Sequence, residues 1–373
     1  MMNITRIETY PLYAPLTQPY GDANGYKNYR TSFMFRIITE SGLEGWGEVV
    51  DWLPTLDKGF RERIIPFLLG RDATNHLKLV NTIKKWNQRI AAGVSMALTE
   101  ILARKAQLSV CDLWGGSYRN AVPIYASFQS YSPSDEWIKS SVQLVQEVMA
   151  EGYNKIKVKI GGKTEKEDLQ HLRALFDVTE DTVGMAIDGN ESYDLSTTFQ
   201  WIKILESSHP ILWFEEPMPM NQINDYQLLR MKSTIPIAGG ENKKSVKEVL
   251  PLLQQGALDI LQPDPMHLGG IEEYRHSLQL ARTFGIKVSP HSFDGILSRL
   301  YAIFAQACLV PWSKMNEEDI EPIEWDVMEN PFNRLIPLQP SAGKVRVPTG
   351  IGIGVSIDVE LLQKYSWKGE IYH

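Results

Sequence analysis

From Val122 onward, short apolar runs alternate with longer segments in which apolar residues recur every three or four positions. The short runs have the composition of strands buried on both faces, and the longer segments have the period of amphipathic helices. The pattern predicts eight strands: Val122–Phe128, Lys155–Ile160, Val183–Asp188, Ile211–Glu216, Ile235–Gly240, Leu258–Pro263, Lys287–His291 and Ile323–Met328. Seven helices are expected between them: Ser134–Glu151, Glu165–Thr179, Leu195–Ser207, Ile223–Lys232, Ser245–Gln255, Ile271–Phe284 and Gly295–Cys308.

Apolar strands separated by helices are typical of a parallel sheet in an α/β protein. Eight strands with seven helices favour a (β/α)7β modified TIM barrel, with an open doubly wound sheet as the alternative. A dinucleotide-binding sheet would carry a GxGxxG sequence after its first strand, and none follows the first strand here. We therefore expect a barrel over residues 122–338.

The chain before Val122 has a different pattern. Apolar and polar residues alternate over residues 2–13, Thr31–Ile38 and Leu43–Val50, which predicts three antiparallel strands. Three helices are expected to follow: Asp57–Leu69, Asn75–Gln88 and Val94–Ala106. A sheet followed by helices predicts an α+β capping domain over residues 1–121.

Two segments of the chain lack a clear period. Thr17–Tyr29 is rich in Gly, Asn and Tyr, and it is expected to be either an irregular surface connection or a mobile lid over a pocket. Residues 339–373 carry Gly343, Gly350, Gly352 and Gly354 among strand-forming residues. This last segment is too irregular for a barrel helix, and we expect it to return and pack on the capping domain.

The strand Lys155–Lys159 places three lysines on one face, because side chains alternate along a strand. An exposed edge strand with protective lysines would explain the pattern of Lys155, Lys157 and Lys159 if the strand stood alone. In a buried strand, however, these ammonium groups need anions opposite them. Acidic residues at the ends of the following strands could provide those anions.

Ionisable residues end one predicted barrel strand after another. Because the active sites of such barrels lie at the C-terminal ends of the strands, this end is the expected site. So many charges together would be unfavourable unless they bind a metal and a substrate. The residues concerned are Lys157, Lys159, Asp188, Glu215, Glu241, Asp264, His291 and Glu324.

Asp188, Glu215 and Glu241 end three successive strands and can converge as oxygen ligands. Three carboxylates suit a hard cation, Mg²⁺ before Mn²⁺. Such a cation would offset the charge of Lys159, and close cationic neighbours would lower the pKa of this lysine toward the range of a general base.

Asp264 and His291 end adjacent strands, so the carboxylate can accept a hydrogen bond from one imidazole nitrogen and leave the other basic. His267 could reach the same end of the barrel but is more simply placed outside it. A serine hydrolase could also use a His–Asp pair, with Ser289 or Ser292 as the nucleophile. The GxSxG sequence that positions such a serine is missing, which disfavours this alternative.

Composition narrows the class of protein further. The 373 residues include 38 Lys and Arg against 45 Asp and Glu, a formal net charge of −7 without a basic block, which disfavours nucleic acid and anionic membranes as partners. Cys111 and Cys308 are the two cysteines, so neither a disulfide framework nor a zinc site is indicated. No run approaches the ~18 apolar residues of a membrane helix, and residues 1–11 do not read as a signal peptide. We expect a soluble, cytoplasmic protein.

Taken in order, these motifs resemble those of the enolase superfamily and, within it, the mandelate racemase subgroup. The resemblance covers nearly the whole chain, including the Leu113-Trp114-Gly115-Gly116 linker. Its motifs are Lys157-Val158-Lys159, Ile187-Asp188-Gly189-Asn190, Phe214-Glu215-Glu216-Pro217, Gly239-Gly240-Glu241-Asn242, Gln262-Pro263-Asp264-Pro265, Ser289-Pro290-His291-Ser292 and Ile323-Glu324-Trp325.

The resemblance implies a shared first step, in which a base removes the proton α to a carboxylate and one Mg²⁺, with Mn²⁺ as a substitute, stabilises the enediolate. It implies that Lys159 and His291 are bases on opposite faces of the substrate, that Asp264 orients His291, and that Lys157 and protonated Glu324 meet the developing charge. Asn190 matches a polar position of the family. A symmetric homo-oligomer is also implied.

The densely polar site favours an acid-sugar dehydratase that gives a 2-keto-3-deoxy acid. A racemase or epimerase of a 2-hydroxy acid is the alternative, and a sugar-acid binding protein on an inactive barrel is the non-enzymatic one. Substrate contacts are expected from the segments Tyr20–Tyr29 and Val49–Trp52, and from Tyr20 and Trp52 in particular, because these segments mix aromatic residues with Asn, Asp and Lys. Lys155 is expected near the strand start, with a structural role and no identified charge partner.

Overall fold

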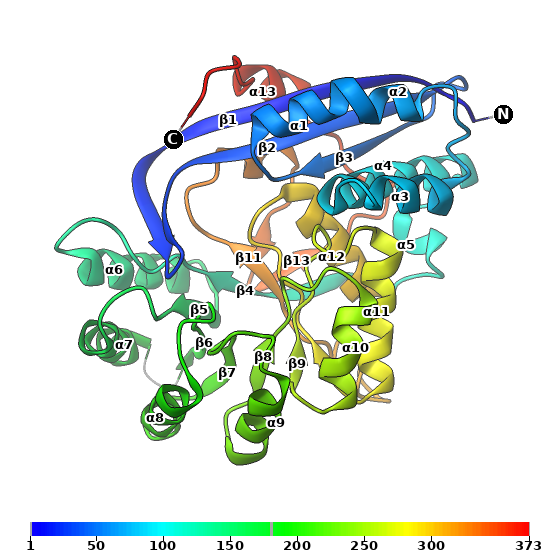
Figure 1. Ribbon diagram of the computed structural model, residues 1–373. Coiled ribbons are helices and arrows are strands. Elements are labelled where there is room, and N and C mark those ends of the chain that lie inside the picture. Colours follow the sequence, from blue (N-terminus) through cyan, green and yellow to red (C-terminus); the bar gives the residue numbers. More distant parts are fainter. Residues whose placement is uncertain (1, 180–181, 373) are drawn as a thin grey trace.

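Eight parallel strands in sequence order form the centre of the protein, as the computed structural model, which describes residues 2–179 and 182–372, shows (Figure 1). Each strand pairs in parallel with the next from the first to the seventh, and the eighth pairs with the first. The strands are β4 (Ala121–Ser127), β5 (Lys155–Lys159), β6 (Gly184–Asp188), β7 (Ile211–Glu215), β8 (Ile237–Gly239), β9 (Ile260–Leu261), β10 (Lys287–Val288) and β11 (Ile323–Asp326). Between β10 and β11, the Glu324 N–H donates to the Pro290 carbonyl at 3.2 Å.

In the described residues, one α-helix follows each of the first seven barrel strands, which confirms the (β/α)7β barrel. The helices are α6 (Trp137–Ala150), α7 (Glu165–Thr179), α8 (Leu195–Glu206), α9 (Ile223–Lys232), α10 (Val246–Gln254), α11 (Ile271–Thr283) and α12 (Ile296–Cys308). All seven fall within the ranges predicted from their periodicity.

Alternation along the strands sorts the barrel interior from its exterior. In β5, Ile156 and Val158 belong to the large core between strands and helices, while Lys157 and Lys159 are buried on the other face. The bottom of the interior is apolar and is formed by Tyr125, Ala186, Trp213, Ala238 and Ile260. Asp188 and Glu215 stand two residues beyond Ala186 and Trp213 on the same strands, which places these carboxylates at the C-terminal ends.

The capping part is a three-stranded antiparallel sheet with helices on one side, placed above the barrel (Figure 1). Its strands are β1 (Ile4–Asp22), β2 (Gly25–Thr39) and β3 (Glu44–Val49). Its helices are α1 (Leu53–Gly59), a π-helical turn (Phe60–Ile64), α2 (Ile65–Leu68), α3 (His76–Lys84), α4 (Gln88–Ala106) and α5 (Val110–Leu113). Phe33, Phe35 and Phe60 fill the core between sheet and helices.

The expected loop Thr17–Tyr29 is instead the end of a β-hairpin. After an irregularity between Pro15 and Tyr20, β1 and β2 continue to pair up to Asp22 and Gly25. The φ of +126° at Gly25 suits the tight two-residue connection. Gly21 exchanges backbone hydrogen bonds of 2.8 and 3.1 Å with Tyr131, next to β4. The segment is therefore not an irregular connection, and a lid that moves over a pocket stays a prediction.

Arg30 joins the hairpin to the barrel. Its guanidinium is 2.6 Å from the Asp294 carboxylate and 2.8 Å from that of Asp326, which follow β10 and end β11. Arg30 and Asp326 are buried. Because both ion pairs cross from the capping part to the barrel, they hold the hairpin over the C-terminal ends of the strands.

The last segment contacts both parts of the molecule. A short hairpin of β12 (Pro340–Ser341) and β13 (Lys344–Arg346) follows a 3-10 helix (Pro331–Leu335), and β13 pairs antiparallel with the beginning of β4. After α13 (Val359–Lys364), the chain bonds to β1, where the Trp367 N–H donates to the Pro11 carbonyl at 2.8 Å. The segment thus packs on the capping part as expected, while the exact domain boundaries stay a prediction.

No helix within residues 2–179 and 182–372 combines the length and apolar character needed to cross a membrane.

The helix α4 begins beside the site and is fixed there by a side-chain cap. Asn87 accepts a hydrogen bond of 3.0 Å from the Ile90 N–H. We expect Asn87→Ala to lower the free energy of unfolding by about 1 kcal/mol, because one buried donor loses its acceptor. Chemical denaturation would measure the loss. Asn75→Ala is the control, since Asn75 precedes α3 without a side-chain cap, and an equal loss in both variants would contradict the assignment.

Candidate active site

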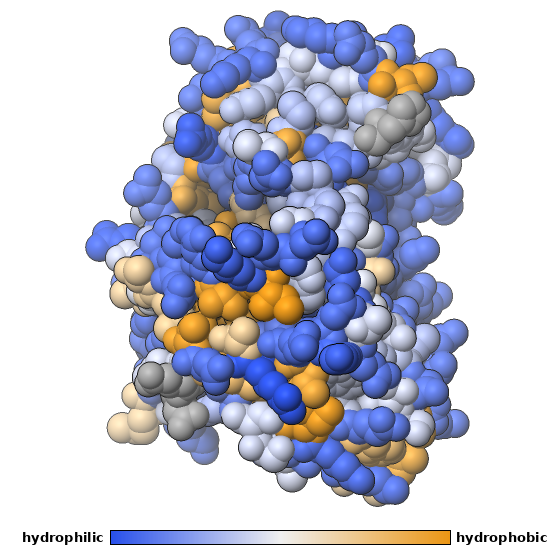
Figure 2. Space-filling model, turned by 90° about the vertical axis from the view of Figure 1, so that its left-hand side faces the viewer, coloured by the Kyte–Doolittle hydropathy of each residue, from blue (hydrophilic) through white to orange (hydrophobic). Residues whose placement is uncertain are grey.

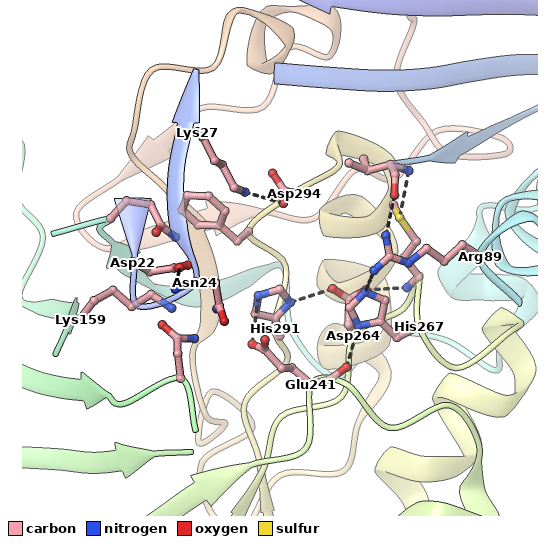
Figure 3. Close-up of a pocket in the computed structure, with 15 residues that line it drawn as sticks. Asp22, Asn24, Lys27, Arg89, Lys159, Glu241, Asp264, His267, His291 and Asp294 are labelled. Carbon is pink, nitrogen blue, oxygen red and sulfur yellow. Dashed lines mark hydrogen bonds and ion pairs between the residues drawn. The ribbon is translucent and has the colours of Figure 1, made fainter. Parts of the chain in front are cut away.

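A cavity of about 160 Å³ opens between the hairpin and the C-terminal ends of the barrel strands (Figure 3). We call it the mouth cavity. Side chains from both parts of the molecule line it, and most are polar or charged: Asp22, Asn24, Lys27, Val50, Arg89, Gln129, Lys159, Asn190, Glu241, Asp264, Met266, His267, His291, Phe293 and Asp294.

Lys157 lies below the mouth cavity in a ring of carboxylates. Its Nζ is 2.5 Å from Glu215 Oε1, 2.9 Å from Glu324 Oε1 and 3.5 Å from Asp188 Oδ2, and the side chain is fully buried. Burial opposes the charged form, but these carboxylates outweigh it and hold the pKa of Lys157 well above its ordinary value. The lysine and its anions therefore stabilise one another, as the strand pattern predicted.

Lys159 lines the mouth cavity itself and is bound to one carboxylate. Its Nζ lies 2.5 Å from Asp188 Oδ2. Burial works against the ammonium group, yet the Asp188 charge outweighs burial and the nearby Lys157, so the pKa of Lys159 is raised. The predicted lowering of this pKa depends on a bound cation and stays a prediction, because without one the charge that faces the lysine most closely is negative.

Lys155 stands at the start of β5 and lies outside this ring of carboxylates. It is partly exposed and donates to Asn154 Oδ1 at 3.4 Å. Since water reaches it, Lys155 needs no buried counter-charge, which answers the question left open by the sequence.

Asp264 and His291 form the predicted pair. His291 Nδ1 lies 2.7 Å from Asp264 Oδ2, and the Met266 N–H donates to the other Asp264 oxygen at 2.6 Å. His291 Nε2 faces Glu241 at 3.2 Å and Glu324 at 3.4 Å. Burial would lower the pKa of His291, but these carboxylates outweigh it and raise it well above its ordinary value. A protonated His291 would direct its Nε2–H at the carboxylates of Glu241 and Glu324.

Glu324 is held from three sides. Ser127 Oγ donates to its Oε1 at 2.6 Å, the Ser292 N–H donates to its Oε2 at 2.9 Å, and Lys157 lies beside Oε1. Burial would raise the pKa of Glu324, but Lys157 and His291 outweigh burial and lower it. The cations around Glu324 favour the carboxylate in this arrangement, and its protonation toward a bound substrate stays a prediction.

The hydroxyls of the two serines near His291 donate to backbone carbonyls. Ser289 Oγ donates to the Pro322 carbonyl at 2.6 Å, and Ser292 Oγ donates to the Glu324 carbonyl at 2.8 Å. Neither is arranged as a nucleophile for His291, which agrees with the missing GxSxG sequence.

Two of the three expected substrate contacts lie outside the mouth cavity. Asn190 lines it. Trp52 packs on Tyr372, with ring centroids 4.4 Å apart, and is 37% exposed. Tyr20 is buried, and its hydroxyl donates to the Glu329 carbonyl at 3.0 Å. The structure gives no support to direct contact of Trp52 or Tyr20 with a molecule in the mouth cavity, because their partners hold them away from it.

Sequence reasoning expected the segment Tyr20–Tyr29 to face the substrate but did not single out the residues that line the mouth cavity. Lys27 and Asp294 form an ion pair of 2.9 Å at the cavity wall, and Asp22 and Asn24 reach it from the hairpin tip (Figure 3). Their positions depend on the path of the hairpin, which no local pattern encodes. Glu216 could have been found, because it follows Glu215 directly in the Glu-Glu-Pro motif.

His267 also reaches the mouth cavity, contrary to the simpler expectation. Its Nε2 lies 3.2 Å from the Arg89 guanidinium, which can only donate, so Nε2 is the acceptor. Nδ1 must then carry the proton and donates to the Glu241 carbonyl at 2.8 Å. This chain from Arg89 on α4 to the backbone of Glu241 fixes the loop after β8 against the capping part.

The donor set at this end of the barrel fits a hard divalent cation. Asp188 and Glu215 are register partners on β6 and β7, and Glu241 follows β8. Among the described residues, the buried Asn190 Oδ1 lacks a hydrogen-bond partner. Burial raises the pKa of Glu216 well above its ordinary value, and the charge of Glu241 adds to this effect. A cation beside these carboxylates would favour their charged forms.

The three predicted ligands are not gathered into one shell in this arrangement. In residues 2–179 and 182–372, no three His, Cys, Asp or Glu side chains form a group that could hold an ion. Lys157 and Lys159 take oxygens of Glu215 and Asp188, and Glu241 faces His291. Ligation by Asp188, Glu215 and Glu241 therefore stays a prediction.

Comparison with protein families gives two matches that together span most of the chain. Residues 140–361 match the enolase C-terminal domain-like family, and residues 7–115 match the N-terminal domain of mandelate racemase and muconate lactonizing enzyme.

Individual proteins resemble the chain over nearly their full length. D-galactarolactone cycloisomerase of Agrobacterium fabrum is 28% identical, covering 98% of this chain and 99% of that protein. Arabinonate dehydratase of Saccharolobus solfataricus is 30% identical, covering 89% and 90%. The crystal structure of a racemase from Streptomyces coelicolor with bound magnesium shares the fold, with a TM-score of 0.85, 21% identity and coverage of 98% and 100%.

Proposed function

The chain belongs to the mandelate racemase and muconate lactonizing enzyme family of the enolase superfamily, and on that premise we propose that it removes the proton α to the carboxylate of an acid sugar and then eliminates an oxygen at the β-carbon. The observation that supports this most is the placement of Lys159 on one side of the mouth cavity and of His291 with Asp264 on the other (Figure 3). A substrate between them meets a nitrogen on each face.

The α-proton of a carboxylate is weakly acidic, so its removal needs positive charge near the carboxylate oxygens. Mg²⁺, with Mn²⁺ as a substitute, would be held by Asp188, Glu215 and Glu241 and would supply that charge when bound. Lys157, on the same side of the barrel, adds a fixed positive charge. We propose that one such ion is bound.

The proposed elimination uses the two nitrogens in turn. Lys159 Nζ accepts the α-proton in its neutral form, which requires Asp188 to be released from its present pair with Nζ. As the Cα–H bond breaks, its electron pair moves toward the β-carbon. The β-oxygen leaves with its bonding electrons and takes the proton of His291 Nε2, while Asp264 accepts from Nδ1 throughout. The enol that remains tautomerises to a 2-keto-3-deoxy acid.

Two substrates are consistent with this elimination. If the leaving oxygen is a hydroxyl, water departs and the enzyme is an acid-sugar dehydratase, our first choice. If the oxygen belongs to a ring, the same bond cleavage opens the ring and the enzyme is a cycloisomerase. The similarity to D-galactarolactone cycloisomerase over 98% of the chain supports this second candidate. We further propose cytoplasmic location and a symmetric oligomer.

Proton NMR in D2O with Mg²⁺, over a panel of mono- and diacid sugars and their lactones, tests the proposal. Loss of the α-proton signal with new 3-deoxy methylene signals would establish elimination and identify the substrate. Exchange of the α-proton without those signals would instead favour a racemase or epimerase. Binding without exchange across the whole panel would contradict the proposal and favour a binding protein on an inactive barrel.

Removing divalent cations is expected to abolish this exchange, because the buried carboxylates would then pair with the lysines as they do here. The measurement is the exchange rate after treatment with a chelator and again after addition of Mg²⁺ or Mn²⁺. Recovery with either ion is the expected result. A rate that is indifferent to chelation would contradict the assignment of Asp188, Glu215 and Glu241.

A further inference from the structure

A second cavity of about 380 Å³ lies beside the mouth cavity, outside the first barrel strand. We call it the outer cavity. It is enclosed by the hairpin strand β1, the β4–α6 connection, α6 and the chain after β11, and its lining residues are Gln18, Pro19, Tyr20, Gln129, Ser130, Tyr131, Ser132, Ser134, Trp137, Ser140, Ser141, Leu144, Val327, Met328 and Glu329. On the face that carries α6, apolar atoms gather at mid-height within a largely hydrophilic surface (Figure 2).

The chemistry of the outer cavity differs from that of the mouth cavity. Among the described residues that line it, none is Lys, Arg or His. Its one carboxylate, Glu329, accepts hydrogen bonds of 2.9 and 2.8 Å from the backbone and side chain of Thr17. The remaining lining combines serine hydroxyls with aromatic and aliphatic side chains. Such a lining suits an uncharged group that has hydroxyls and an apolar face.

The aromatic walls are held by bonds directed away from the outer cavity. The Tyr131 hydroxyl donates to Asp168 Oδ1 at 2.6 Å, and the Trp137 ring packs between Tyr131 and His171, with centroids 5.2 and 4.9 Å away. The Tyr20 hydroxyl is bound to the Glu329 carbonyl. Because these residues are fixed by other partners, the outer cavity is preformed.

Gln129 lies at the border between the two cavities. It lines both of them, is 6% exposed, and its Oε1 is buried without a hydrogen-bond partner in the described part of the chain. A buried amide oxygen without a partner is unfavourable, so a donor is expected to meet it. The hydroxyls of Ser132 and Ser140 likewise make no hydrogen bond to the described residues, and they can bind further oxygens.

Ser130 places the outer cavity close to the reacting groups. It lines the outer cavity, and its Oγ accepts the Lys159 N–H at 2.8 Å. The outer cavity therefore lies next to the strand that carries Lys159, and the Gln129 side chain stands between the two cavities.

We propose that the outer cavity is a subsite for the uncharged, hydroxylated end of the substrate, with Gln129 Oε1 as the acceptor for one of its hydroxyls. This inference rests on the proposed function for its link to an acid sugar. The site itself is defined by its own residues, and a neutral polyol can occupy it without any reaction.

Xylitol, a neutral five-carbon polyol, is the probe. Calorimetric titration of the full-length protein is expected to show saturable binding, and a crystal soaked in xylitol is expected to show the molecule in the outer cavity. Gln129→Leu should weaken binding about tenfold, since one buried hydrogen bond is lost at similar side-chain volume. Gln143→Leu is the matched control, because Gln143 is an exposed glutamine of α6 that lines neither cavity.

A second variant tests the outer cavity independently, in case Gln129→Leu does not fold. Leu144→Phe fills the outer cavity from α6 without touching the mouth cavity, and it should abolish xylitol binding while thermal unfolding stays close to that of the wild type. The proposal is overturned if xylitol does not bind saturably, if it occupies the mouth cavity alone, or if all variants bind it equally.

Failure of this proposal can be told apart from failure of the proposed function. Xylitol has no carboxylate and no acidic α-proton, so its binding does not depend on catalysis. Xylitol in the outer cavity without α-proton exchange on any acid would support the subsite and contradict the proposed reaction. Exchange on acid sugars without xylitol binding would support the reaction and overturn the subsite.

Discussion

Replacing Lys159 with Met is expected to lower the rate of α-proton exchange by about 10²–10⁴-fold, the typical contribution of a positioned general base. The thioether has nearly the length of the lysine side chain but cannot accept the proton. The rate would be followed by NMR in D2O with Mg²⁺ and the best acid of the panel.

Lys155→Met is the matched control for this variant, because Lys155 is on the same strand but partly exposed at its other end. Its rate should stay near that of the wild type. Full activity in Lys159→Met would remove this lysine from the mechanism.

His291→Asn separates the two halves of the reaction. Elimination should be lost, because no imidazole remains to protonate the leaving oxygen, while exchange at the α-carbon can continue at Lys159. An unchanged rate of elimination would exclude His291 as the acid.

Replacing Lys157 with Met is expected to have the largest effect on stability. The variant leaves Glu215, Glu324 and Asp188 buried without the ammonium group that lies 2.5, 2.9 and 3.5 Å from them. Removing one partner of a buried ion pair costs about 3–5 kcal/mol, since the remaining charge stays out of water. Denaturant unfolding in the presence of a chelator would measure this loss without a metal to replace the lysine.

Lys344→Met provides the comparison for Lys157→Met. Lys344 and Glu318 are 3.2 Å apart, but both side chains are about half exposed. Their pair should contribute less than about 1 kcal/mol. A loss for Lys157→Met as small as that for Lys344→Met would show that the buried carboxylates are neutralised in another way.

The barrel and the position of its charged residues along the strands could be predicted, because both depend on local periodicity. The apolar runs that end in Asp188 and Glu215 are short enough to be strands, and alternation by two decides which side chains enter the interior. The strand order then follows from the helices between them. These steps need no knowledge of distant contacts.

The hairpin and the cavity walls could not be predicted because they depend on distant contacts. Pairing continues to Asp22 and Gly25 because Gly21 bonds to Tyr131 and Arg30 bonds to Asp294 and Asp326, residues that lie 110 to about 300 positions away. Arg89 and His267 meet for the same reason. A sequence of Gly, Asn and Tyr is equally compatible with a loop when these partners are unknown.

The pairing of the buried charges could not be predicted for a more local reason. Side-chain conformation decides that Lys159 faces Asp188 most closely, and the spacing of residues does not encode that conformation. Glu324 illustrates the same point, because Ser127, Lys157 and the Ser292 N–H together favour its ionised form. Sequence spacing predicts which groups gather but not which pairs form.

Contacts with the last residues of the described chain also decide when the capping part can finish folding during synthesis. The Leu53 N–H donates to the Tyr372 hydroxyl at 2.9 Å, and the Tyr13 N–H donates to the Tyr365 carbonyl at 2.9 Å. The capping sheet leaves the ribosome first, yet these partners are translated more than 300 residues later. Until then its aromatic surface around Tyr13 and Trp52 is uncovered, so nascent chains should depend on chaperones more than a barrel alone would.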